Sequence, residues 1–319
     1  MHEFELIKKY FSKLSKFNKS SLNLNDDVFF DKKKNLVISI DTYNLGSHFL
    51  DFKKPDLVIK KIIRSSISDL ICKGVLPKFY FISGSGNRKT FSKTNLEKIS
   101  KSLSQEQKKY GIFLCGGDTT FSNQLSFSIT SVGFSNDIIY RNKAKKNDDI
   151  YITGNLGDSF TGLKILKNKI KVKKKIKDYF VSKYYQPDIH LKLSKKLLNF
   201  ANTSIDVSDG LIADLEKMIN KQKLSYQLYE DKIPISNNLL NLLKVKKLNK
   251  SKFVSNGDDY QILFTACNDQ SRIINKTFKK LNIKVSKIGK INSFKHKSVI
   301  IDQKGKHLLI KNKGYSHQF

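Results

Sequence analysis

Nine aspartates stand where short apolar or glycine-containing segments of this sequence end. They are Asp26, Asp27, Asp41, Asp69, Asp118, Asp206, Asp209, Asp258 and Asp259. Carboxylates at strand ends can gather at one rim of a sheet, and two unit charges about 4 Å apart repel by ~4 kcal/mol at an effective dielectric of about 20. Divalent cations together with a polyphosphate would relieve that repulsion. The pattern therefore predicts a magnesium-dependent site for a nucleotide.

The net charge of the chain has the opposite sign. Lys+Arg number 60 against 28 Asp+Glu, a formal charge of +32, which by itself suggests a nucleic-acid partner. Nucleic-acid readers favour arginine, however, and the only arginines here are Arg64, Arg88, Arg141 and Arg272. Lysine is accompanied by much Asn, Ile, Phe and Tyr, so an A/T-rich genome explains the charge better. We expect no specific nucleic-acid partner, and a basic nucleic-acid-binding protein is kept only as an alternative.

The length of 319 residues predicts two domains with sizeable cores. No apolar stretch approaches the ~18 residues of a membrane span, and residues 1–14 have helical periodicity without a signal-peptide core. The three cysteines are isolated, with no partner at metal-binding spacing, which is typical of a reducing compartment. We therefore expect a cytoplasmic protein with no membrane association.

Strand and helix patterns alternate along the chain. Strands are predicted at 36–40, 112–115 (buried), 124–134, 149–153, 203–205, 224–229, 260–266, 284–290 and 297–302, and helices at 1–14, 56–72, 92–109, 210–220, 236–247 and 269–281. The polar segment 135–149 separates two α/β halves, which we place at 1–137 and 138–319. The lysine-rich segment 164–177 is interpreted as a solvated stretch without chemistry.

The usual nucleotide and hydrolase motifs are missing. Residues 84–90 look like a phosphate loop but fail its spacing, because Arg88 stands where the second glycine belongs. The protein-kinase set, the nucleophile elbow and the HExxH zinc motif do not occur either. A nucleotide would have to be bound by aspartates and backbone.

Asp69 is the most informative single position. On the predicted helix 56–72 it shares a face with Ile62, Ser65 and Ser66. A carboxylate on a mostly apolar face is costly to bury unless a partner or a metal compensates it. The alternative is an exposed acid at the end of the helix.

Two further segments carry candidate ligands. Gly116-Gly117-Asp118 follows a predicted strand, so its backbone could approach a phosphate while Asp118 binds a metal, although an ordinary tight turn is equally compatible. In the segment 205–211, Ser208 or Asp209 could simply cap a helix, which leaves Asp206 unexplained.

Adjacent aspartates occur twice, at 26–27 and at 258–259. In each pair we expect only one carboxylate to point inward, because neighbouring side chains of an extended segment face opposite ways.

Taken together and in order, these motifs resemble the thiamine-monophosphate kinase family of the aminoimidazole-ribonucleotide-synthetase-like superfamily. The resemblance covers nearly the whole chain. It is carried by FELIKKYF from Phe4, SIDT at 39–42, GSHF at 46–49, SDL at 68–70, GGDTT at 116–120, YITG at 151–154 with GDS at 157–159, IDVSDGL at 205–211, GDDY at 257–260 and KGY at 313–315.

This resemblance implies ATP-dependent phosphorylation of thiamine phosphate to thiamine diphosphate with several Mg²⁺ ions. It also implies a two-domain α/β fold with mixed sheets and a homodimer formed through the N-terminal domains. The implied metal ligands are Asp27, Ser39, Ile40, Asp41, Asp69, Asp118, Asp206 and Asp209, with Asp69, Asp118 and Asp206 central to catalysis. The implied ATP contacts are Gly117, Asp118, Arg141 and Ser208, and the implied substrate contacts are His48, Asp258 and Tyr315.

The sequence departs from the family pattern at three places. The family's GIGDD is Asn23-Leu24-Asn25-Asp26-Asp27 here, a threonine is replaced by Ile40, and GGED becomes Asn256-Gly257-Asp258-Asp259. Ile40 would still offer its backbone carbonyl to a metal, whereas Asp258 is one methylene shorter than the usual glutamate. Within the superfamily, aminoimidazole-ribonucleotide synthetase and selenophosphate synthetase are the alternatives, and the latter normally needs an N-terminal cysteine that is absent here.

Overall fold

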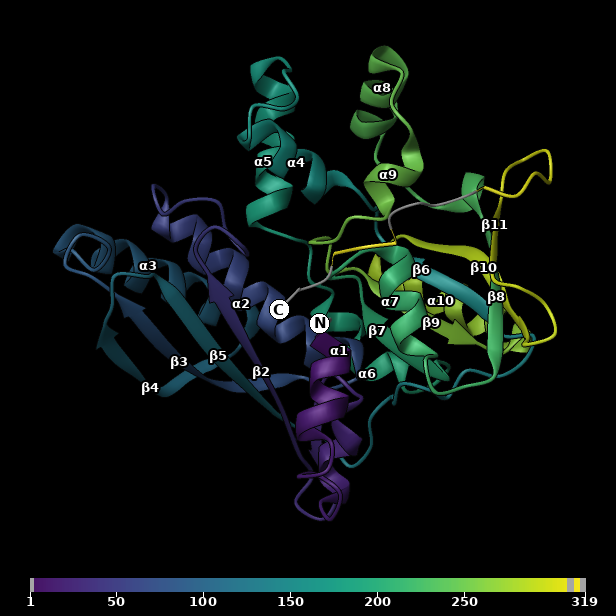
Figure 1. Ribbon diagram of the computed structural model, residues 1–319, viewed down its shortest axis with the longest axis horizontal. Coiled ribbons are helices and arrows are strands. Elements are labelled where there is room, and N and C mark those ends of the chain that lie inside the picture. Colours follow the sequence, from purple (N-terminus) through teal and green to yellow (C-terminus); the bar gives the residue numbers. More distant parts are fainter. Residues whose placement is uncertain (1–2, 309–312, 316–319) are drawn as a thin grey trace.

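Two β-sheets, each covered by helices, organise the residues that the computed structural model describes, 3–308 and 313–315 (Figure 1). The first sheet has the order β1 (Phe29–Asp31), β2 (Leu36–Asn44), β5 (Ser126–Phe134), β3 (Pro77–Gly86), β4 (Phe113–Phe121). The second has the order β11 (Val299–Ile301), β8 (Leu224–Tyr229), β10 (Val285–Ser293), β6 (Asp149–Thr153), β9 (Ile262–Ala266), β7 (Thr203–Asp206). Both sheets are mixed, which confirms the predicted fold class.

The helices connect and cover these sheets. They are α1 (Glu3–Leu6), α2 (Pro55–Cys72), α3 (Lys93–Tyr110), α4 (Asp158–Leu166), α5 (Lys174–Tyr185), α6 (Ser194–Leu197), α7 (Leu211–Met218), α8 (Asn237–Lys246), α9 (Lys250–Val254) and α10 (Ser271–Leu281). Helix α1 continues into a π-helical turn at Ile7–Phe11, so the predicted N-terminal helix is shorter than expected. Among the described residues, none of the helices has the length and apolarity to cross a membrane.

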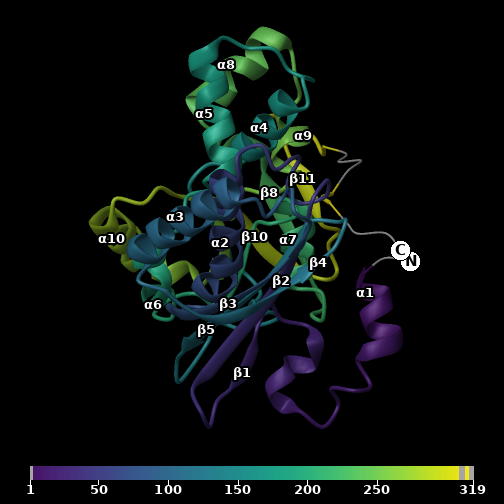
Figure 2. The same ribbon diagram turned by 90° about the vertical axis from the view of Figure 1, so that its left-hand side faces the viewer.

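Helix α2 joins the two halves. Pro55 begins it, as proline's fixed φ allows at a first turn, and the helix is buried along nearly its whole length. Figure 2 shows α2 and α3 on one face of the first sheet. Ile62 and Ile63 belong to the same apolar core as Phe264 of β9 and Phe278 of α10, so the halves share one core. The last strand of the first sheet ends at Phe134 and the second sheet begins at Asp149; the domain boundary at 137/138 remains a proposal.

Most predicted strands and helices occur within a few residues of their expected limits. The prediction that the strand at 112–115 is buried is wrong. Ile112 is buried, whereas every residue of β4 from Phe113 to Phe121 is exposed. The Gly116-Gly117-Asp118 segment lies inside this strand and not in a loop. The reason is position: β4 is the edge of the first sheet and pairs only with β3 among the described strands. Apolar residues that suggested burial therefore face solvent in the single chain.

Candidate functional site

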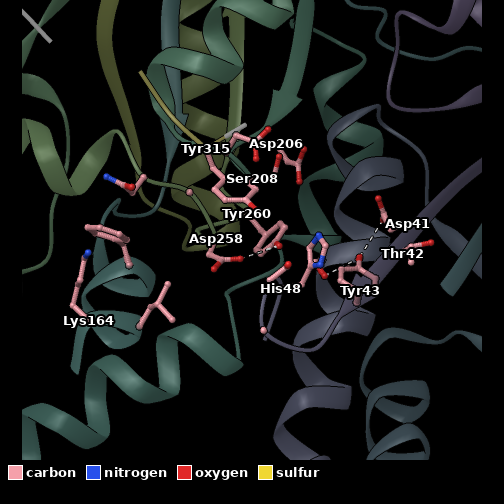
Figure 3. Close-up of a pocket in the computed structure, with 18 of the residues that line it drawn as sticks. Asp41, Thr42, Tyr43, His48, Lys164, Asp206, Ser208, Asp258, Tyr260 and Tyr315 are labelled. Carbon is pink, nitrogen blue, oxygen red and sulfur yellow. Dashed lines mark hydrogen bonds between the residues drawn. The ribbon is translucent and has the colours of Figure 1, made fainter. Parts of the chain in front are cut away.

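A cavity of about 470 Å³ opens between the two halves of the molecule (Figure 3). The first half contributes the end of β2, the loop that carries His48, and one face of α2. The second half contributes α4, the segment after β7, the 256–260 loop and Tyr315. Asp41, Asp69, Asp206 and Asp209 line one region of the cavity, as expected for strand-end and helix-end carboxylates that converge.

Three carboxylates form the centre of the acidic region. One oxygen from each of Asp27, Asp69 and Asp206 lies within 4.8 Å of the others. Asp27 precedes β1, Asp69 lies in the last turn of α2, and Asp206 ends β7, so the packing of α2 against β7 brings them together. The donor atoms are all carboxylate oxygens, which are the ligands that Mg²⁺ prefers. The helical-face argument for Asp69 is consistent with this position.

Burial makes the ionised form of these acids costly. It raises the pKa of Asp206 and of Asp41 to about 6. The pKa of Asp69 lies well above its ordinary value because of burial, with repulsion from Asp41 and Asp206 adding to the effect. Hydrogen bonds from Ser68 Oγ to Asp206 Oδ2 (2.5 Å) and from the Tyr43 hydroxyl to Asp41 Oδ2 (3.1 Å) offset part of the cost. A bound cation would offset the remainder.

Two basic side chains contact the same acids. Lys73 Nζ lies 2.8 Å from Asp26 Oδ1 and 2.8 Å from Asp27 Oδ2. Arg141 donates from Nε to Asp27 Oδ2 at 3.1 Å, and its terminal nitrogen contacts Asp27 Oδ1. Both members of the 26–27 pair therefore point inward, and the expectation that only one would do so is wrong. The bend of the chain before β1 lets a single ammonium face both.

The second aspartate pair also turns inward at both positions. Asp258, at φ 68°, places Oδ2 2.9 Å from Lys61 Nζ, and the Tyr260 hydroxyl donates to its Oδ1 at 3.2 Å. Asp259 accepts hydrogen bonds from the backbone N–H groups of Gly157 (2.7 Å) and Ser159 (3.3 Å), where α4 begins. The left-handed conformation at Asp258 breaks the strand alternation on which the prediction depended.

His48 and Tyr315 also line the cavity: Figure 3 shows Tyr315 beside Asp206 and Ser208, and His48 beside Tyr43. The backbone N–H of Asn44 donates to His48 Nδ1 at 3.0 Å, which places the proton of a neutral ring on Nε2. The backbone N–H of Tyr315 donates to the carbonyl of Asp209 at 2.9 Å, so the described part of the C-terminal segment returns to the start of α7. The fold thus brings these two residues, which lie far apart in the sequence, to one cavity.

Three lysines from the segment 164–177 also line the cavity: Lys164, Lys167 and Lys169. Burial lowers the pKa of Lys164, and the neighbouring positive charges of Lys169, Lys252 and Lys167 lower it further. Lys167 and Lys169 are exposed, in line with the solvated stretch that the sequence predicts. Lys164 lies in α4, Lys167 follows its last residue and Lys169 comes shortly after, so the end of this helix brings the group to the cavity.

Curated relatives match this chain along its whole length. A thiamine-monophosphate kinase of Buchnera aphidicola subsp. Schizaphis graminum is 34% identical over 99% of this chain and 98% of its own length. That of Haemophilus influenzae is 34% identical over 92% and 90%, and that of Escherichia coli K12 is 31% identical over 82% of each. This chain belongs to the thiamine-monophosphate kinase family.

Family models and solved structures agree with the family assignment. Residues 25–135 match the N-terminal domain of AIR synthase related proteins. The structure of AaThiL complexed with AMPPCP and TMP superposes with a TM-score of 0.85 at 24% identity, covering 99% of this chain and 97% of that one. Thiamine monophosphate kinase from Aquifex aeolicus gives a TM-score of 0.79 at 25% identity, with 96% and 97% covered. The fold of this chain is that of its family.

The family's expected metal ligands divide into two groups in this structure. Asp27, Asp41, Asp69, Asp206 and Asp209 gather in or beside the cavity, and Ser39 is buried next to α2. The side chain of Ile40 points away from them and is 69% exposed. Asp118 does not line the cavity; it lies on the exposed edge strand β4 with Gly117.

The ATP contacts expected at Ser208 and Arg141 lie closer to the acidic centre than Asp118 and Gly117 do. Ser208 lines the cavity, whereas Arg141 contacts Asp27 as described above. Residues that sequence reasoning did not single out are Tyr43, Lys61 and Lys73, which are buried, and Tyr260, which is partly buried. Lys61 and Lys73 are the ones the sequence could have indicated, because a lysine in the core-facing pattern of α2 requires a carboxylate partner.

Proposed function

We propose that this protein transfers the γ-phosphoryl group of ATP to the phosphate of thiamine monophosphate, which forms thiamine diphosphate and ADP. The observation that carries the proposal is full-length similarity to thiamine-monophosphate kinases combined with a cavity whose acidic end collects Asp41, Asp69 and Asp206. The transfer is direct and in line. The attacking atom is an oxygen of the substrate phosphate, which is ionised at neutral pH, so no general base is needed.

Mg²⁺ fits the acidic end of the cavity. Asp27, Asp69 and Asp206 would hold it, with Asp41 and Asp209 close by, because they offer carboxylate oxygens only and their charges require compensation. When bound, the ions neutralise the phosphates and reduce the repulsion between two anionic reactants. The side chains of the protein position those carboxylates: Ser68 orients Asp206, and Tyr43 orients Asp41.

The remaining wall suits the thiamine part of the acceptor. Tyr315 and His48 offer flat rings, and Asp258 offers a carboxylate that Lys61 and Tyr260 hold in place. Because Lys61 balances its charge, Asp258 acts as an oriented hydrogen-bond acceptor more than as a net negative charge. We therefore assign His48, Asp258 and Tyr315 to substrate binding. The lysines at 164, 167 and 169 add a positive region that favours approach of phosphorylated substrates at low salt.

A second copy of the chain is needed to place Asp118. Its register neighbours across the first sheet are Ser83, Ser128 and Thr42, one in each successive strand. Three strand spacings of ~4.8 Å separate Asp118 from Thr42 by ~14 Å. Asp41 lies one residue from Thr42 and faces the other side of the sheet, toward α2. Asp118 therefore cannot reach the acidic centre of its own chain.

Two open edges of the first sheet support the proposal of a homodimer. β1 pairs with β2 only at Leu36–Ile38, so within the described chain the rest of β2, from Ser39 to Asn44, has an open edge. β4 is the other open edge, and the outer face between them exposes Ile40, Phe81, Phe113, Phe121 and Phe134. An exposed apolar sheet with free edges indicates an interface. We propose that β4 of each chain pairs beside β2 of its partner, so that Asp118 and Gly117 complete the partner's ATP and metal site.

Gly117 leaves no room for a side chain within its own sheet. A Cβ at that position would lie 1.8 Å from the carbonyl oxygen of Ile82, so any side chain would displace the strand. Arg141 and Ser208 supply the other proposed ATP contacts. Because Arg141 is held by Asp27, we expect a metal ion on Asp27 to release the guanidinium toward a phosphate.

The test is a coupled assay with purified protein, ATP, Mg²⁺ and thiamine monophosphate, in which thiamine diphosphate is separated and quantified. We expect product formation that depends on all three, and an Asp69→Asn variant as the inactive control. Turnover only with a formylglycinamidine ribonucleotide would contradict the proposal and favour an aminoimidazole-ribonucleotide-synthetase activity.

A further inference from the structure

Lys73, the residue after the last turn of α2, carries a fully buried ammonium group. The residue is 0% exposed, and its Nζ lies 2.8 Å from each of three oxygens. These are Asp26 Oδ1, Asp27 Oδ2 and the backbone carbonyl of Ser204. An ammonium has three N–H donors, so every donor has an acceptor. The arrangement is a small cage of oxygens closed around one positive charge.

The cage is fixed from both halves of the molecule. The Lys73 carbonyl accepts a hydrogen bond from Ile139 N–H at 3.0 Å, and the carbonyl of Cys72 accepts one from Ser204 Oγ at 2.5 Å. Asp26 and Asp27 come from the loop before β1, whereas Ser204 belongs to β7. Lys73 cannot swing out to solvent without separating these segments. Arg141, the other cation on Asp27, contacts this carboxylate through its guanidinium nitrogens.

The ammonium lies beside the proposed metal ligands. Asp27 is one of the three acids whose oxygens converge, and the charge of Lys73 also acts on Asp69, where it opposes the rise in pKa. Two buried carboxylates at adjacent positions would otherwise attract a cation from solution. Oxygen donors of this kind, two carboxylates and a backbone carbonyl, are those that hard divalent cations use in proteins.

We infer that Lys73 is a built-in cation of this site, whose ammonium occupies a position between Asp26 and Asp27 that would otherwise bind one more metal ion. The inference rests on the proposed function, which makes Asp27 a metal ligand. It implies that Asp27 is partly neutralised before any ion arrives. Once Arg141 leaves Asp27, only Oδ1 is open to the Mg²⁺ shared with Asp69 and Asp206, because Lys73 stays on Oδ2.

The experiment counts Mn²⁺ ions, as a spectroscopic substitute for Mg²⁺, bound to the full-length protein without nucleotide. Free Mn²⁺ is measured by electron paramagnetic resonance in wild type and in Lys73→Met, which keeps the length of the side chain and removes its charge. We expect Lys73→Met to bind one more Mn²⁺ per chain and to gain more in melting temperature from Mn²⁺ than wild type does. An equal or smaller number of ions would overturn the inference and leave Lys73 a structural ion-pair partner.

Lys61→Met is the matched control, because it removes an equally buried ammonium, within α2 and paired with Asp258 outside the converging acids. It should destabilise the protein without changing the number of Mn²⁺ ions. Lys73→Gln replaces Lys73→Met if the latter does not fold, and the same criterion applies. The kinase assay on wild type is independent of this count: an inactive wild type with the extra ion in the variant would contradict the proposed function and not the role of Lys73.

Discussion

Subunit complementation tests where Asp118 acts. If Asp118 completes the partner's site, a chain with Asp118→Asn and a chain with Asp69→Asn are each inactive as homodimers. In the mixed dimer, one site combines an intact Asp69 with an intact Asp118 from the partner, and the other site lacks both. Equal amounts of the two chains form dimers in a 1:2:1 ratio, so half of the molecules regain one of two sites. The expected recovery is about one quarter of wild-type activity.

The structure makes the two outcomes distinct. Asp118 is ~14 Å from Thr42 along the sheet and faces the side opposite to Asp41, so a site within one chain would require β4 to leave β3. If Asp118 nevertheless served its own chain, every site in the mixed dimer would lack one carboxylate, and recovery would be zero. The assay is thiamine diphosphate formation after co-expression with two affinity tags and purification of the mixed dimer, which should then have half the wild-type rate.

A mixture of Asp69→Asn and Asp206→Asn chains is the control. Both residues converge within one chain, so neither mixed site is complete and no activity should return. Recovery in this control would mean that chains exchange in some other way, and it would refute the assignment of Asp69 and Asp206 to one cluster. Zero recovery in the Asp118 and Asp69 mixture, with the tagged dimer present, would refute the edge-strand arrangement.

Three further predictions concern the buried charges. Asp69→Asn should lower kcat by more than about 100-fold, because even indirect partners of a metal ligand cost 10–100-fold, yet it should raise the melting temperature in EDTA since a buried charge is removed. Asp258→Asn should destabilise the protein by about 3 kcal/mol in urea denaturation, because it leaves the Lys61 ammonium buried without its partner; a loss below 1 kcal/mol would show that this ion pair is not formed. Without metal, the free energy of unfolding should rise as pH falls from about 7 toward 4. The pKa of Asp206 is about 6 in the folded state and near 3.8 in the unfolded state, so ionisation of Asp206 costs the folded state on the order of 3 kcal/mol above pH 6. Saturating Mg²⁺ should remove this pH dependence.

The acidic half of the site was accessible from sequence because each carboxylate ends an element whose type the pattern predicts. Asp41 follows a mostly apolar strand at 36–40, Asp206 ends the short strand that begins at Thr203, and Asp69 lies in the last turn of α2. Once the elements are known, their ends converge at one cavity. Local pattern alone therefore indicated most of the acidic centre, and the family resemblance supplied the expected role of each residue.

The position of Asp118 could not be predicted in this way. Phe113, Leu114 and the two glycines give the same apolar signal whether the strand is covered by its own chain or by a second copy. Sequence periodicity reports that a surface is hydrophobic, and it does not report which molecule covers it. The error in calling this strand buried within the single chain follows directly from that ambiguity.

The lysines show a related limit. An A/T-rich genome explains many exposed lysines, because an exposed ammonium costs little wherever it stands. Lys61 and Lys73 are different: burying an ammonium costs several kcal/mol unless acceptors are supplied, and each has carboxylate oxygens within 2.9 Å. Composition treats all these residues alike, whereas the free energy of burial separates them. The same chain can therefore have a formal charge of +32 and still bring the carboxylates of Asp27, Asp69 and Asp206 together at one centre.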